Sequence, residues 1–80
     1  MLNSHLVTAL TLDEHRELSR EMRLTTRRLR TLCELAVNVY GPQSRIAFSF
    51  QRAIEDIERL NQDLKSQAAQ DGFTGTDLYL

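Results

Sequence analysis

Arginines at helical spacing are the residues of this sequence best suited to chemistry. Five of them recur at steps of four, three, four and three, with a sixth beside the row: Arg16, Arg20, Arg23, Arg27, Arg30 and the neighbouring Arg28. On a helix this spacing places the side chains along one face. Between residues 22 and 33 there are four arginines and no acid, so the row predicts a basic surface that could contact nucleic-acid phosphates. The competing interpretation is a solvated charged face, which is more common, and no aromatic residue lies in the row to stack on bases.

The histidines and the cysteine do not form a catalytic or metal-binding pattern. His5 and His15 have no second His or Cys at zinc-ligand spacing, and Leu12 stands where an inward Glu-x-x-His motif would need a glutamate. Cys33 has no histidine nearby in the expected layers and is best explained as a small buried side chain. No glycine-rich phosphate loop or Gly-x-Ser-x-Gly motif occurs. We therefore expect a protein that is not an enzyme and uses no cofactor or metal.

Glycine, proline and one capping motif divide the chain into two long helical segments. Thr11 and Glu14 have the spacing of a capping box. Gly41 suits the left-handed position that closes a helix, and Pro42 suits the first turn of the next one. We expect one all-α domain over residues 1–80, with these parts: an N-terminal arm at 1–10, a first helix at 11–40, a turn at 41–42, a second helix at 42–70 and a flexible C-terminal tail at 71–80.

Both helical segments repeat apolar residues at steps of three and four, the heptad pattern of helices that pack side by side. In heptad letters, the a and d positions of the first segment are His15, Leu18, Met22, Thr25, Leu29, Leu32, Ala36 and Val39. Those of the second are Gln43, Ile46, Phe50, Ala53, Ile57, Leu60, Leu64 and Gln67. The tight turn predicts an antiparallel helical hairpin in which these two seams face each other.

The e positions beside the seams are mostly small or apolar. They are Thr26, Cys33, Tyr40, Ala47, Ile54 and Ala68. A hairpin has nothing of its own to cover this flank and is marginally stable alone. We therefore expect these residues to form a dimer interface, so that two copies make a four-helix bundle as a homodimer. The alternative occupant is a helix or hairpin of a second protein.

Composition excludes several classes of protein. The 80 residues suffice for one domain, and ten Lys and Arg against eleven Asp and Glu give a net charge of −1, which is neither a polybasic binder nor an acidic tail. A single cysteine permits no intrachain disulfide. No apolar run is long enough for a membrane span, and the first ten residues do not read as a signal peptide. We expect a cytoplasmic protein with no membrane partner.

Apolar residues outside the seam and flank suggest a further contact. Leu35, Val37 and Phe48 gather near the turn, where they could make extra contacts within the bundle or dock a second protein. The preferred function is a non-enzymatic, self-associating protein–protein interaction module. The alternative is a small dimeric regulator that binds nucleic acid through the arginine row.

Overall fold

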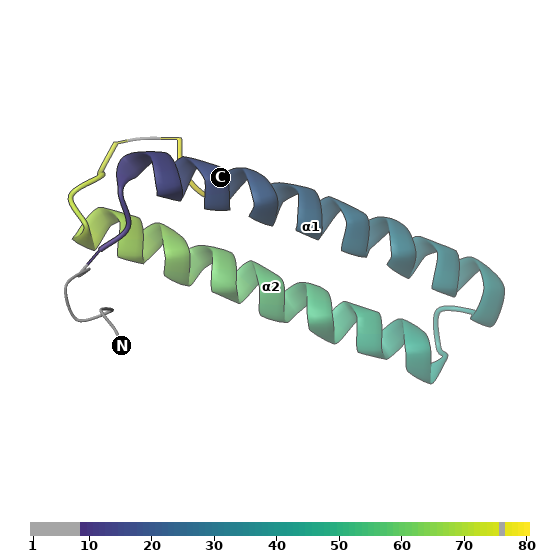
Figure 1. Ribbon diagram of the computed structural model, residues 1–80. Helices are drawn as coiled ribbons and strands as arrows, with labels where there is room; N and C mark the ends of the chain where they lie inside the picture. The colour runs from purple at the N-terminus through teal and green to yellow at the C-terminus, as the bar shows by residue number, and fades with distance from the viewer. Residues whose placement is uncertain (1–8, 76) are drawn as a thin grey trace, which may run out of the picture.

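The computed structural model describes residues 9–75 and 77–80. It contains two helices, α1 at Leu12–Tyr40 and α2 at Arg45–Gln70, which lie side by side and antiparallel (Figure 1). The described residues contain no strand, so the expected all-α hairpin is confirmed. Residues 1–8 of the expected N-terminal arm lie outside the described residues.

The start and end of α1 follow from its local sequence. The capping box is confirmed, because the Thr11 hydroxyl accepts from the Glu14 amide at 3.1 Å and the Glu14 carboxylate accepts from the Thr11 amide at 2.9 Å. These bonds satisfy two amide groups that the helix itself leaves without partners. At the other end Gly41 has φ of +92°, and its amide donates to the Val37 carbonyl at 2.9 Å. Glycine adopts this backbone conformation without steric penalty.

Helix α2 begins at Arg45, three residues later than expected. Ser44 caps it, since its hydroxyl accepts from the Ala47 amide at 3.2 Å, while Pro42 lies in the turn. The Ser44 hydroxyl gives the Ala47 amide the hydrogen-bond acceptor that the helix itself does not supply. Ser44, and not Pro42, therefore sets the start of α2. The connection therefore spans 41–44 instead of 41–42.

Replacing the cap serine tests this boundary. Ser44→Ala is expected to lower the free energy of unfolding by about 1 kcal/mol, because the Ala47 amide loses its acceptor. The control is Ser49→Ala, an exposed serine inside α2, where alanine has the better helix propensity and no stability is lost. Urea denaturation followed by circular dichroism measures both. Equal stability of the two variants would contradict the capping role.

The seam between the helices is rotated toward the expected flank. The buried or half-buried side chains that repeat at steps of four and three occupy a and e positions: His15, Ser19, Met22, Thr26, Leu29, Cys33 and Ala36 in α1, and Ala47, Phe50, Ile54, Ile57, Asn61, Leu64 and Ala68 in α2. Several of the expected d residues are exposed instead: Leu32 is 50% exposed, Val39 63%, Ile46 43% and Leu60 48%. The prediction of an a and d seam is therefore wrong for most of the d positions, whereas Leu18 and Ala53 are half-buried as expected.

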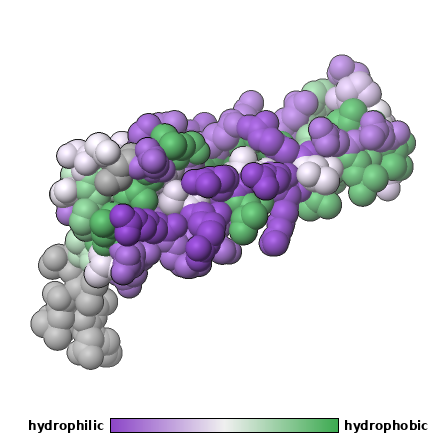
Figure 2. Space-filling model, turned by 90° about the horizontal axis from the view of Figure 1, so that it is seen from above, coloured by the Kyte–Doolittle hydropathy of each residue, from purple (hydrophilic) through white to green (hydrophobic). Residues whose placement is uncertain are grey.

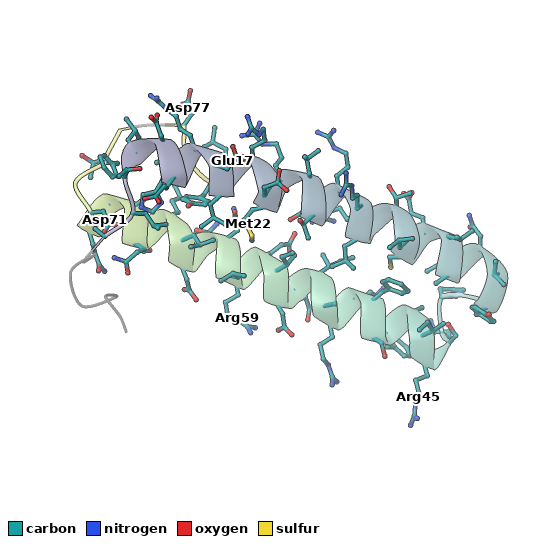
Figure 3. The ribbon with its side chains drawn as sticks, in the orientation of Figure 1. Glu17, Met22, Arg45, Arg59, Asp71 and Asp77 are labelled. Atoms are coloured by element: carbon teal, nitrogen blue, oxygen red, sulfur yellow. The ribbon has the colours of Figure 1, made fainter. Side chains whose placement is uncertain are left out.

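The fully buried side chains of the two helices are mostly small, whereas several large apolar side chains stay exposed. Cys33, Ala36, Ala47 and Ala68 are buried along the hairpin, whereas the largest exposed apolar residues are leucine, isoleucine, valine, phenylalanine and tyrosine. Polar residues at the e positions find partners inside: the Thr26 hydroxyl donates to the Met22 carbonyl at 2.8 Å. Figure 3 shows Met22 pointing between the helices and Arg45 and Arg59 pointing away from α1. A single hairpin thus uses only part of its apolar surface for its own core.

The C-terminal tail packs on the open end of the hairpin, where the sequence predicted a flexible segment. Leu78 and Tyr79 are buried in one cluster with Met22 and Ala68, and Phe73 packs against it. The tail returns along α1 at the end opposite the turn (Figure 1). The apolar side chains of the tail fill the space beside Ala68, which a small side chain leaves open.

Candidate interaction surfaces

Four exposed apolar residues at d positions form what we call the apolar strip: Leu32, Val39, Ile46 and Leu60. On helices whose a and e positions face inward, d positions point to one side of the pair and b positions to the other. In an antiparallel pair, equivalent heptad positions of the two helices lie on the same side. Both helices therefore contribute to a single apolar face of the hairpin.

The expected dimer interface lies largely inside the hairpin. Cys33, Ala47 and Ala68 are buried by their own chain, and Thr26 and Ile54 are half-buried in the same seam. The prediction that these side chains face a second copy is therefore corrected, because the helices of one chain already cover them. The sixth residue of that set, Tyr40, remains 68% exposed beside the turn.

The candidate docking residues at the turn are only partly exposed. Leu35 and Phe48 are more than half exposed, whereas Val37 is half-buried. Figure 2 shows hydrophobic atoms gathered at the turn end of the molecule and hydrophilic atoms over the middle of α1. Leu35 precedes an a position and lies beside the strip, while Phe48 is at an f position that points away from it.

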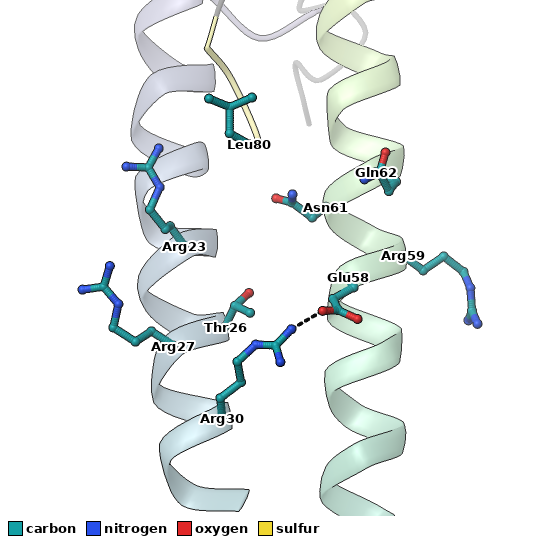
Figure 4. Close-up of a pocket in the computed structure, with 9 residues that line it drawn as sticks. All are labelled: Arg23, Thr26, Arg27, Arg30, Glu58, Arg59, Asn61, Gln62 and Leu80. Atoms are coloured by element: carbon teal, nitrogen blue, oxygen red, sulfur yellow. Dashed lines mark hydrogen bonds and ion pairs between the residues drawn. The ribbon is translucent and has the colours of Figure 1, made fainter. Parts of the chain in front are cut away.

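The arginine row lines two adjoining hollows on the side of the hairpin where the tail ends. The larger hollow, of about 690 Å³, we call the arginine groove: it is lined by Arg23, Thr26, Arg27, Arg30, Glu58, Arg59, Asn61, Gln62 and Leu80 (Figure 4). The smaller, of about 360 Å³, shares Arg23 and adds Arg16 and Arg20 beside the tail. Arg28 lines neither of these two hollows. The structure thus brings five of the six candidate arginines to one surface.

A cluster that the sequence reasoning missed fastens the tail, and we call it the tail clasp: His15, Ser19, Asn61, Asp71 and Tyr79. The Tyr79 amide donates to the Ser19 hydroxyl at 2.9 Å, and the Asn61 amide group donates to the Tyr79 carbonyl at 3.0 Å. The Tyr79 hydroxyl lies 2.8 Å from His15 Nδ1. One tail residue is therefore bonded to both helices, which holds it at φ of +58° in the left-handed region that tyrosine rarely adopts.

The partners of His15 occupy both of its ring nitrogens. Nε2 lies 2.8 Å from Asp71 Oδ2, and because a carboxylate can only accept, Nε2 is the donor in this bond. Nδ1 forms the second bond, with the Tyr79 hydroxyl. The hydrogen bond from His15, followed by the one from Gln67, lowers the pKa of the Asp71 carboxyl below its ordinary 3.8. The clasp therefore requires an ionised Asp71, and its contribution to stability is lost as the pH falls through that lowered pKa.

The clasp is a structural cluster and not an open catalytic site. His15 has no exposed surface and Tyr79 is only 2% exposed, so a substrate cannot reach the imidazole or the phenol. The tail covers the ring of His15, which contacts the rings of Phe73 and Tyr79 edge-on. In the part of the chain that the structure describes, no three His, Cys, Asp or Glu side chains come together as a metal site.

Alkaline pH is expected to weaken the docked tail. Burial, followed by the Asp71 charge, raises the pKa of the Tyr79 phenol above its ordinary 10.0. The unfolded chain loses this proton near pH 10.0 while the folded chain retains it, so the stabilisation is complete below pH 10.0 and is lost as the pH rises through the raised pKa. A Tyr40→Phe chain leaves Tyr79 as the single tyrosine, and tyrosinate absorbance then reports it alone. Ionisation of Tyr79 at pH 10.0 without loss of stability would contradict its burial.

Comparison with known protein families, curated proteins and solved structures gives no match. Within the described residues, neither helix contains a stretch that is long and apolar enough to cross a bilayer. The surfaces above are therefore the basis for assigning a function.

Proposed function

We propose that this chain is a non-enzymatic interaction module that self-associates through the apolar strip. The observation that carries the proposal is the packing of the hairpin, whose fully buried apolar positions are mostly alanine and cysteine, while Leu32, Val39, Ile46 and Leu60 stay exposed. An apolar face of this kind marks a contact with another molecule. The d positions therefore take the place of the e positions as the proposed dimer interface.

A second copy fits this strip better than an unrelated partner does. Equivalent positions of α1 and α2 supply the strip, so a copy related by a twofold axis presents the same apolar face in return. Stacking the two faces makes a four-helix bundle in which each helix keeps an antiparallel neighbour. The large side chains of the two apolar strips then pack against each other and form the centre of the bundle.

The docked tail supports this choice of face. The clasp joins the tail to Ser19 and Asn61, which occupy e positions, so the tail lies toward the side of the arginine groove. The tail therefore does not cover Leu32, Val39 and Ile46, which are all at least 43% exposed. The strip needs cover from outside the hairpin.

Sedimentation equilibrium of the purified chain across a wide dilution range tests the proposal. The expected result is a mass of twice 9.2 kDa that falls toward the monomer only on dilution. A folded chain that sediments as a monomer at every concentration would overturn it. Circular dichroism at the same concentrations separates a folded monomer from an unfolded one.

A further inference from the structure

We propose that the arginine groove binds the phosphodiester backbone of a nucleic-acid duplex, and that Glu58 competes with phosphate for Arg30. This inference goes beyond the proposed self-association and does not depend on it. The groove lies on the b side of the helix pair, because Arg23 and Arg30 are b residues, whereas the apolar strip lies on the d side. Both surfaces can therefore be occupied at once.

The charges of the groove favour an anion. The side chains of its lining include four arginines and one carboxylate, that of Glu58. Arg30 forms an ion pair with Glu58 across the two helices (Figure 4), and Arg59 pairs with Asp56. Among the described residues, no carboxylate lies within ion-pair distance of Arg23 or Arg27. Two guanidinium groups are thus available to a ligand, and a third becomes available when Glu58 releases it.

The spacing of these arginines suits a linear polyanion better than a compact ligand. Arg23, Arg27 and Arg30 succeed one another along α1, and a rise of about 1.5 Å per residue spreads them over about 10 Å. The row continues into the smaller hollow through Arg16 and Arg20, which pair with Asp13 and Glu17. Guanidinium groups match phosphate oxygens with two parallel hydrogen bonds. A chain of phosphates therefore fits the row.

The groove reads the backbone and not the bases. Its lining contains no aromatic side chain on which a base could stack. Binding should therefore be independent of sequence, and it should weaken as salt rises because each neutralised phosphate releases counterions. With the strips facing each other in a dimer, the two grooves point outward on opposite sides, so each copy contacts a duplex with its own three arginines.

Fluorescence anisotropy with labelled duplex DNA and labelled duplex RNA tests the proposal. Three phosphate contacts predict that affinity falls about 40-fold between about 50 mM and about 200 mM salt. Arg23→Gln removes one contact and should reduce that change to about 12-fold. Arg28→Gln makes the same change of charge on the same helix outside both hollows, and it should keep the 40-fold change.

Glu58→Gln provides a test by gain of binding. It frees Arg30, so affinity for either duplex should rise severalfold. Glu55 does not line the groove, so Glu55→Gln should raise the affinity less. Affinity for either duplex that depends on Arg23 and Arg27 supports the proposal. It is overturned if neither duplex binds the wild type and the Glu58→Gln chain at about 50 mM salt. Binding of inorganic polyphosphate alone, or equal losses for Arg23→Gln and Arg28→Gln, would also overturn it.

Discussion

A chain that carries both Leu32→Glu and Val39→Glu is expected to sediment as a folded monomer. Both side chains are at least half exposed in the hairpin, so the hairpin does not need them for its own packing. In a bundle, covering the exposed half of each is worth about 0.8–1.5 kcal/mol, and the dimer contains two copies of each. Losing all four contributions, about 3–6 kcal/mol, raises the dissociation constant of the dimer by about 10² to 10⁴. Burying the new carboxylates would add a further penalty.

Phe48→Glu is the matched control for this variant. Phe48 is 51% exposed, almost the same as Leu32 at 50%, but its f position points away from the strip. The same change from an apolar to an acidic side chain should therefore leave the dimer intact. If Phe48→Glu dissociates the dimer as strongly as the double variant, the strip is not the interface. Sedimentation velocity gives the mass and circular dichroism the helix content.

Removing the imidazole at the centre of the tail clasp should have the largest effect on stability. His15→Ala leaves a cavity at a side chain with no exposed surface and takes the hydrogen-bond partner from both Tyr79 and Asp71. Cavity and lost hydrogen bonds together predict a loss of about 3 kcal/mol or more in the free energy of unfolding. Hydrogen exchange at the Tyr79 amide should accelerate as well, because the tail that presents it to Ser19 is released.

Gln67→Ala is the control for the clasp. It removes the other side-chain donor to Asp71, at 3.0 Å, but the bond is exposed and should be worth about 1 kcal/mol or less. Guanidinium denaturation compares the two variants. An unfolding free energy for His15→Ala as high as that of Gln67→Ala would show that the tail does not hold the hairpin together.

The sequence predicted the helices because their boundaries depend on local signals. Thr11 and Glu14 form a capping box within four residues, and Gly41 closes α1 at the expected place. The start of α2 was missed because Pro42 and Ser44 are both suitable residues near a helix start, and only the observed turn distinguishes them. These choices involve neighbours in the chain and need no knowledge of distant contacts.

The orientation of the seam could not be fixed in the same way. Apolar residues occupy a, d and e positions in both helices. The a and d positions and the a and e positions therefore each give an acceptable apolar stripe. The observed choice turns Ser19 and Asn61 inward, where both bond the backbone of Tyr79. These bonds join residues up to 60 positions apart, which periodicity does not detect. The available signal in the sequence for this orientation was the polar residues Ser19 and Asn61 at e positions, together with Tyr79 in the tail.

The interaction surfaces were predicted in kind but not in place. The arginine row was visible in the sequence because its members repeat on one helix. Its opposing carboxylate, Glu58, comes from the other helix, so the groove emerges only from the fold. The need for a partner was likewise inferred from excess apolar residues, but rotation of the seam moved that surface from Cys33 and Ala47 to Leu32 and Ile46.

Isotope-filtered NOE spectroscopy on a mixture of labelled and unlabelled chains can detect self-association through the apolar strip. We expect contacts between chains that join methyl groups of Leu32, Val39, Ile46 and Leu60. Contacts between chains that instead involve the Ala47 and Ala68 methyl groups, or a dimer without strip contacts, would contradict it.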